Sequence, residues 1–143
     1  MDHEARRRLE DLLNREVAAA HSLAEVLTAE RAALTGDSPA AVQAKAAEKV
    51  LLLGSIEDLE SERRALWNAA TGAGPGEIIA ARWRALLEVM AGCRLANEVN
   101  GYIIHIRQNQ VRQLLDIVRG GAPVTYGPQG KTLARTPRAL ARA

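Results

Sequence analysis

The chain has 143 residues, of which 48% are hydrophobic but only 3% aromatic, with no Phe and a single Cys. This length suits one modest domain, and a composition rich in Ala, Leu, Glu and Arg is typical of long helices rather than of β-sandwiches or barrels. A lone cysteine excludes a disulfide framework, and the charged start MDHEARRRLE predicts no secretory signal peptide. No apolar run reaches the ~18–20 residues of a membrane span, so we expect a cytoplasmic protein without membrane insertion.

The net charge of +2 is unevenly distributed along the chain. Residues 1–121 carry 15 Lys and Arg against all 17 Asp and Glu, whereas the tail after them carries four Lys and Arg and no acid. The basic balance therefore comes from the tail, which argues against nucleic-acid binding, since that function needs cations clustered on a folded face. A nucleic-acid binder that uses the basic tail stays an alternative, and its affinity would fall steeply with salt.

The first predicted helix spans about residues 2–34. Apolar residues recur along it at steps of four and three, and this heptad stripe predicts packing against other helices. The stripe consists of Leu13, Val17, Ala20, Ala24, Leu27 and Leu34. The segment LTGDSP ends this helix, and Ser38 followed by Pro39 predicts the capped start of the next one.

The second predicted helix spans about residues 39–70 and has a weaker stripe. Its seam consists of Val42, Lys49, Leu52, Ile56, Leu59 and Leu66, with Leu53 and Trp67 beside it. The charged run EDLESERR is interpreted as a solvated face. The segment TGAGPGE is predicted to be a loop, because three glycines and a proline cannot continue a helix.

The third predicted helix begins near Glu77 and is the longest. Its seam keeps the four-and-three alternation through Ile79, Trp83, Leu86, Met90, Cys93, Asn97, Asn100, Ile104, Arg107, Val111, Leu114 and Val118. Because the phase continues past Gly101, we predict one helix of about 40 residues rather than two elements. A hairpin turn at the Asn-Gly pair is the alternative.

The stretch LANEVNGYII interrupts this seam with polar and small residues. Asn97 and Asn100 occupy consecutive seam positions, where a polar residue costs stability but fixes register or partner choice. Gly101 costs about 1 kcal/mol relative to Ala in a helix interior. We therefore expect a local reason for this glycine, such as the close approach of a neighbouring backbone.

The apolar face of the third predicted helix becomes wider after Gly101. Large apolar residues there cover about half of the circumference, against the usual ~100° arc of a helix that is buried on one side. The residues are Ile103, Ile104, Ile106, Val111, Leu114, Leu115, Ile117 and Val118. Such a surface predicts a second partner, bound by helix-in-groove or helix-on-helix packing, unless the first helix simply covers it.

The sequence offers no catalytic or metal-binding constellation. His3, His21 and His105 lack metal-ligand spacing among themselves or with Cys93, which lies on the apolar seam as a core thiol. Neither GAGPGE nor GPQGKT has the glycine spacing of a nucleotide-binding loop. We therefore predict that the protein is not an enzyme and needs no cofactor or metal.

The tail places one tyrosine in a frame of turn residues. Tyr126 is followed by Gly127 and Pro128, after the helix-breaking Gly120 and Gly121. We expect a tail that is flexible when free, and a tyrosine among small residues suits a short docking peptide. A disordered tail without a role is the alternative.

These segments together resemble the FlgN-type flagellar export chaperones. The most specific are the Asn-x-x-Asn-Gly core of CRLANEVNGYIIHIRQNQVRQLLDIVRG and the Tyr-Gly-Pro-x-Gly tail in TYGPQGKT. The helical pair around LTAERAALTGDSPAAVQAKAAEKVLLLGSIEDLESERRAL also fits, so the resemblance covers nearly the whole chain.

The resemblance implies a cytoplasmic chaperone for the hook–filament junction proteins FlgK and FlgL. Such chaperones bind the C-terminal helical region of their client, prevent premature assembly and deliver the client to the flagellar type III export gate. It further implies that the client meets Ile103 to Val118, and that Tyr126 with its neighbours docks at the gate.

The fold expected from these observations is all-α. Three long helices pack as an antiparallel bundle with coiled-coil-like contacts over residues 1–121, and residues 122–143 form a flexible basic tail. A structural coiled-coil adaptor that homodimerises through the third helix is the alternative function, and a homo-oligomer is compatible with either.

Overall fold

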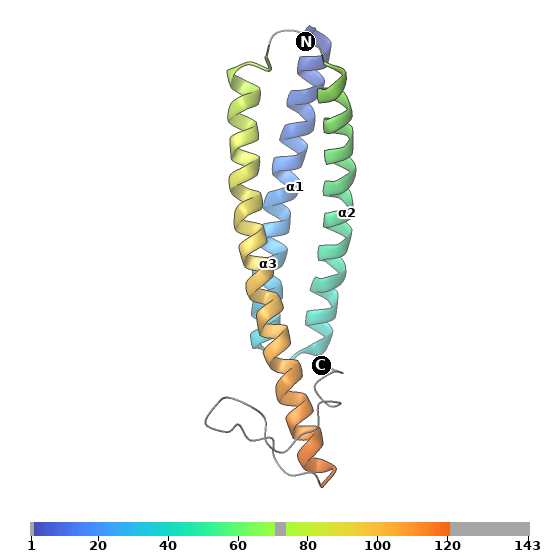
Figure 1. The fold of residues 1–143 in the computed structure, drawn as a ribbon, viewed down its shortest axis with the longest axis vertical. Coiled ribbons are helices and arrows are strands. Elements are labelled where there is room, and N and C mark those ends of the chain that lie inside the picture. Colours follow the sequence, from blue (N-terminus) through green and yellow to red (C-terminus); the bar gives the residue numbers. More distant parts are fainter. Residues whose placement is uncertain (1, 71–73, 121–143) are drawn as a thin grey trace, which may run out of the picture. The chain divides into compact units, whose positions relative to one another are not determined.

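The computed structural model describes residues 2–70 and 74–120, which form three helices and contain no strand (Figure 1). Helix α1 spans His3–Thr35, α2 spans Pro39–Ala69 and α3 spans Glu77–Val118. The all-α prediction is confirmed, and α1 and α2 begin and end within one residue of the predicted bounds.

The chain divides into two compact units, residues 1–100 and residues 101–143. Helix α3 crosses this boundary without a break, with 42 residues in one helix. The hairpin alternative at the Asn-Gly pair is therefore wrong. The second unit is described here only over residues 101–120, so the predicted domain boundary at residue 122 falls outside the described residues.

Side-chain caps begin the first two helices. The Asp2 carboxylate accepts a hydrogen bond from the Ala5 backbone N–H at 2.7 Å, and the Ser38 hydroxyl accepts one from the Ala41 N–H at 3.2 Å. Pro39 occupies the first turn of α2, where its missing N–H costs nothing. The predicted Ser38–Pro39 helix start is confirmed.

Consecutive helices of the first unit run antiparallel. Arg8 near the start of α1 pairs with Glu62 near the end of α2, at 2.9 Å, whereas Glu30 pairs with Lys49, also at 2.9 Å. Later residues of α1 thus meet earlier residues of α2. Figure 1 shows α1 between α2 and the first part of α3.

Helices α1 and α3 run parallel within the first unit. The Cys93 thiol donates to the backbone carbonyl of Ala20 at 3.5 Å, and the Asn100 amide donates to the carbonyl of Leu27 at 2.9 Å. Both pairs are separated by 73 residues, so the two helices keep one register over two turns or more. The arrangement is an up-down-up bundle.

The core of the first unit is built mainly on α1. This helix contributes nine buried residues, α2 contributes Ile56, and α3 contributes Ile79, Leu86, Cys93 and Asn100. The buried α3 residues recur at every seventh position and are alternate members of its predicted seam, whereas Trp83, Met90 and Asn97 between them are not buried. Because Ile56 is the single buried residue of α2, this helix forms the less enclosed side of the bundle.

The predicted seam of α1 needs a correction. The buried positions alternate at steps of four and three through Leu9, Leu13, Glu16, Ala20, Leu23, Leu27, Glu30 and Leu34. Val17 and Ala24, predicted on the seam, are half-buried beside it. The predicted stripe also omitted Glu16 and Glu30, although both are buried at the spacing that the apolar neighbours define.

Candidate functional site

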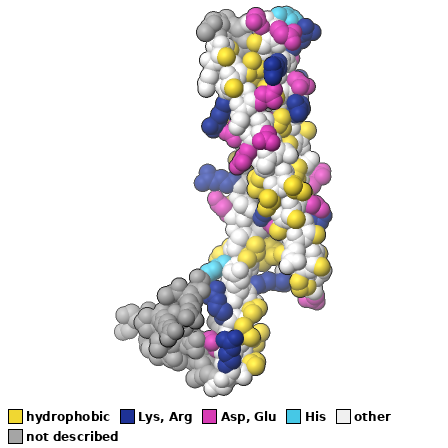
Figure 2. Space-filling view, turned by 90° about the vertical axis from the view of Figure 1, so that its right-hand side faces the viewer, with side chains coloured by type: hydrophobic (Ala, Val, Ile, Leu, Met, Phe, Trp, Pro, Cys, Tyr) yellow, Lys and Arg dark blue, Asp and Glu magenta, His cyan; other side chains and the backbone are white. Residues whose placement is uncertain are grey.

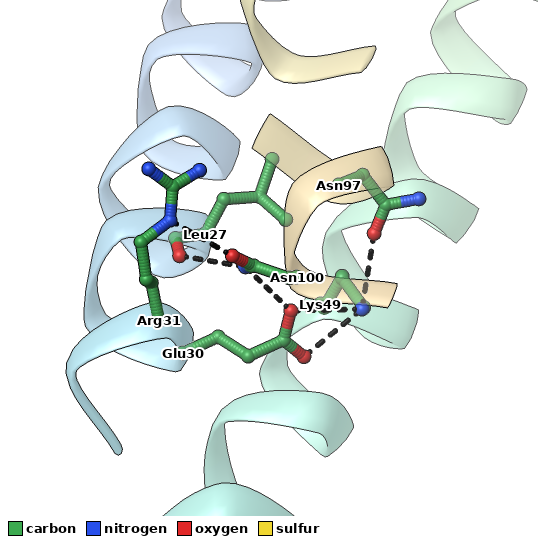
Figure 3. Close-up of polar contacts among 6 residues, drawn as sticks. All are labelled: Leu27, Glu30, Arg31, Lys49, Asn97 and Asn100. Atoms are coloured by element: carbon green, nitrogen blue, oxygen red, sulfur yellow. Dashed lines mark hydrogen bonds and ion pairs between the residues drawn. The ribbon is translucent and has the colours of Figure 1, made fainter. Parts of the chain in front are cut away.

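Asn100 lies at the centre of a polar cluster inside the first unit (Figure 3). Its side chain is fully buried, and its amide nitrogen donates to the Leu27 carbonyl and to Glu30 Oε1, both at 2.9 Å. Its amide oxygen accepts from Arg31 Nε at 3.1 Å. These three hydrogen bonds all go to residues of α1, so Asn100 holds one fixed position of α3 against that helix.

Lys49 extends the cluster to α2. Its ammonium lies 2.9 Å from Glu30 Oε2 and donates to Asn97 Oδ1 at 3.2 Å (Figure 3). Glu30 is 1% exposed, whereas Asn97 is exposed at the edge of the bundle. The two asparagines predicted as equivalent seam residues therefore differ: Asn100 is enclosed and Asn97 is a peripheral acceptor.

A related layer lies further along the bundle. Arg63 Nε donates to both carboxylate oxygens of Glu16, at 2.8 and 3.1 Å, and its guanidinium lies 4.5 Å from the centroid of the Trp83 ring. Burial raises the pKa of Glu16, and the Arg63 charge opposes this shift. Arg63 belongs to the run EDLESERR, which was predicted to be a solvated face. Its side chain is only 12% exposed, so the prediction is wrong for this residue.

The two layers repeat one plan, with a carboxylate on α1, a cation on α2 and an acceptor of that cation on α3. They are separated by 14 residues, or two heptads, on every helix: from Glu16 to Glu30, from Lys49 to Arg63 and from Trp83 to Asn97. A heptad search that admitted charged residues would have found this spacing. Polar layers of this kind fix the register of packed helices.

The described residues carry no arrangement suited to catalysis. They contain no group of His, Cys, Asp and Glu side chains that could hold a metal ion. Cys93 is buried, as predicted for a core thiol, and burial raises its pKa, which keeps the sulfur protonated and unreactive. Within each layer the charged groups pair with one another, Lys49 with Glu30 and Arg63 with Glu16.

Residues 101–118 have the opposite character. No described residue after Asn100 is buried. Of the eight apolar residues predicted as a binding surface, Ile103 and Ile104 are half-buried and six are exposed: Ile106, Val111, Leu114, Leu115, Ile117 and Val118. The exposed fractions of these six side chains range from 38% at Ile106 to 81% at Val118.

Gly101 begins this segment, and its predicted explanation is wrong. A Cβ atom built on Gly101 would meet none of the described residues' atoms within 4 Å, so no described backbone approaches it closely. The residue stands at the boundary of the two compact units. We find no packing reason for the glycine.

The tail residues predicted to dock at the export gate, Tyr126, Gly127 and Pro128, lie outside the described residues. Within the described part of the chain, no helix is both long and apolar enough to cross a membrane. On the face drawn in Figure 2, hydrophobic side chains gather in patches between charged ones.

Comparison with known proteins decides the family. The model of the FlgN protein family matches residues 1–134. The chain belongs to the FlgN family. Two curated FlgN relatives, each named flagella synthesis protein FlgN, come from Salmonella typhimurium and Salmonella typhi. Each is 29% identical over 128 residues, covering 87% of this chain and 90% of its own length. No solved structure matches the chain significantly.

Proposed function

We propose that this FlgN-family protein is a cytoplasmic flagellar export chaperone for hook–filament junction proteins of the FlgK and FlgL type. Family membership supports a role in flagellum synthesis, which is the role that the two Salmonella relatives are named for. One structural observation carries the chaperone role: a continuous helix exposes most of its large apolar side chains after Gly101. The proposal needs no catalysis, metal or nucleotide.

The proposed client surface consists of Ile103, Ile104, Ile106, Val111, Leu114, Leu115, Ile117 and Val118. An amphipathic C-terminal helix of a client would bury these side chains by helix-on-helix packing. Burial of apolar surface contributes about 25 cal/mol per Å², so a few shared turns give useful affinity while still permitting release. The same contact masks the client helix and prevents premature assembly.

The tail supplies the second proposed contact. Residues 122–143 form a separate segment in this proposal, and Tyr126 with Gly127 and Pro128 docks at the export gate. A tyrosine ring binds a pocket at low cost in side-chain entropy. Client and gate would then be held by different parts of the chain.

A homodimerising adaptor is the second candidate. The observation in its favour is the same exposed surface, because two copies of residues 103–118 could cover one another. A dimer and a client complex would then compete for the same side chains. The two functions predict different species in solution.

The test is sedimentation equilibrium of the full chain with and without the C-terminal segment of a junction protein. A chaperone forms a heterocomplex of fixed stoichiometry with that segment. An adaptor stays a homodimer when the segment is added, and this result would reject the chaperone.

Tyr126→Ala tests whether client and gate contacts are separate. We expect the substitution to leave client binding unchanged and to reduce co-purification with the export gate from cells that make flagella. Equal loss of both interactions would contradict two separate contacts.

A further inference from the structure

Both tryptophans of the chain border one cavity in the first unit. The sequence has two Trp and no Phe, and Trp67 of α2 and Trp83 of α3 line the same hollow of about 280 Å³. Neither ring is enclosed, since Trp67 is 43% and Trp83 is 36% exposed. Large aromatic side chains in a bundle usually fill its core, so two half-exposed indoles at one site call for an explanation.

The cavity has an apolar floor and a cationic rim. Leu13, which is 1% exposed, closes its base, and Arg63, Arg64 and Asn68 complete the wall around the two indoles. No Asp or Glu among the described residues lines it. The volume lies just below the ~300–1,000 Å³ of small-molecule pockets, which suits one or two inserted side chains rather than a cofactor.

The two arginines of the rim differ in how firmly their side chains are held. Glu16 and the Trp83 ring hold the Arg63 guanidinium in place, and its side chain is 12% exposed. Arg64 is 69% exposed and pairs with Glu60 one turn earlier on its own helix, at 2.6 Å. An exposed pair of this kind is weak, so Arg64 can exchange Glu60 for an incoming carboxylate at little cost.

We propose that this cavity is a docking site for an acidic amphipathic helix of a partner protein, distinct from the client surface of residues 103–118. One large apolar side chain of the partner inserts between the two indoles, and an Asp or Glu three or four residues away meets Arg64. Trp and Arg are the residues most enriched at energetic centres of protein interfaces. The arginines favour a partner helix with an acidic flank over one with a basic flank, because like charges brought together across an interface are costly.

The tryptophans themselves report on this site. Because both indoles of the protein line the cavity, any occupant changes the intrinsic fluorescence without a label. The probe is a library of random peptides displayed on a helical scaffold and selected against the full chain. We expect enriched peptides to share an apolar anchor with an acid three or four residues away, and to shift the tryptophan emission.

Arg64→Glu and Arg94→Glu form the matched pair of variants. Both arginines are exposed and pair with a glutamate four residues away on their own helix, but Arg94 does not line this cavity. We expect Arg64→Glu to weaken peptide binding about tenfold or more, and Arg94→Glu to leave it unchanged. Peptides whose acidic residues are replaced by Lys should bind the Arg64→Glu variant more tightly than they bind the native chain.

Three results would overturn the proposal. The first is a selection that yields no peptides, or peptides without acidic bias. The second is equal binding to both variants. The third is self-association of the native chain that Arg64→Glu abolishes, because the occupant would then be a second copy of the protein.

Discussion

The two halves of α3 carry the same heptad pattern and opposite burial. Before the unit boundary, Ile79, Leu86, Cys93 and Asn100 are enclosed at every seventh position. After it, the next two positions of this series, Arg107 and Leu114, are exposed, as are most neighbouring apolar residues. A heptad stripe thus predicts that a helix face will be covered, but not by which chain. We interpret the second half as a packing surface kept for another molecule.

The largest effect should come from the buried ion pair in the first unit. Arg63→Met leaves the Glu16 carboxylate without its partner at a site where it is 2% exposed. Removing one member of a buried pair typically costs about 3–5 kcal/mol. Urea unfolding followed by circular dichroism should show a loss of this size. A loss below about 1 kcal/mol would mean that the layer is solvated.

The pH dependence provides the control for this variant. Burial raises the pKa of Glu16 above its ordinary value of 4.5, so the folded chain retains a proton in a window where the unfolded chain has lost it. The stability from this group is therefore greatest below that value and falls as pH rises through the window. Without Arg63 the window extends upward, so the destabilisation by Arg63→Met should be smaller at about pH 4 than at about pH 7.

Two leucines compare the regions directly. Leu27→Ala removes a side chain that is 1% exposed and should cost about 3 kcal/mol of the free energy of unfolding, through lost burial and a cavity. Leu114→Ala removes one that is 62% exposed and should change it by less than about 0.5 kcal/mol. Urea unfolding of the isolated chain measures both. Comparable losses would show that residues after Gly101 are part of a closed core.

Asn97 and Asn100 allow an exposed and a buried asparagine of the same polar cluster to be compared. Asn100→Leu removes two donated bonds and one accepted bond from a fully buried site, leaves Glu30 and Arg31 with fewer partners, and should cost about 2 kcal/mol. Asn97→Leu removes one peripheral acceptor of Lys49 and should cost far less. Thermal unfolding of both variants is the measurement, and equal losses would contradict the central place of Asn100.

Gly101→Ala should have a small effect, and it is the one substitution of this series expected to stabilise the protein. The added methyl group meets nothing within 4 Å, so the intrinsic preference of Ala for helix, about 1 kcal/mol, is not offset by a clash. Hydrogen exchange of the amides around residue 101 should become slower. Faster exchange would reveal a contact that the glycine accommodates.

Much of the fold followed from the sequence. The unbroken phase past Gly101 predicted α3 as one helix, and Ser38 with Pro39 predicted the start of α2. The predicted seam of α1 omitted Glu16 and Glu30, which are buried because each has a cation opposite on α2. Such pairs depend on the register between helices, which one sequence does not specify.

The candidate sites were predicted to different extents. The apolar residues after Gly101 stood out because they exceed what one-sided burial needs. The cavity between Trp67 and Trp83 could not be predicted, because the two residues come from different helices and meet only through antiparallel packing. Trp83 was expected on the seam, yet it is 36% exposed there.

The most direct test of the client surface compares two leucines of α3 with nearly equal exposure. Leu95 is 63% and Leu114 is 62% exposed, but they lie on opposite sides of the unit boundary. Calorimetric titration with the C-terminal segment of a junction protein should show that Leu114→Asp loses at least about tenfold in affinity, whereas Leu95→Asp binds as the native chain does. Equal affinity of the two variants would contradict a client surface on residues 103–118.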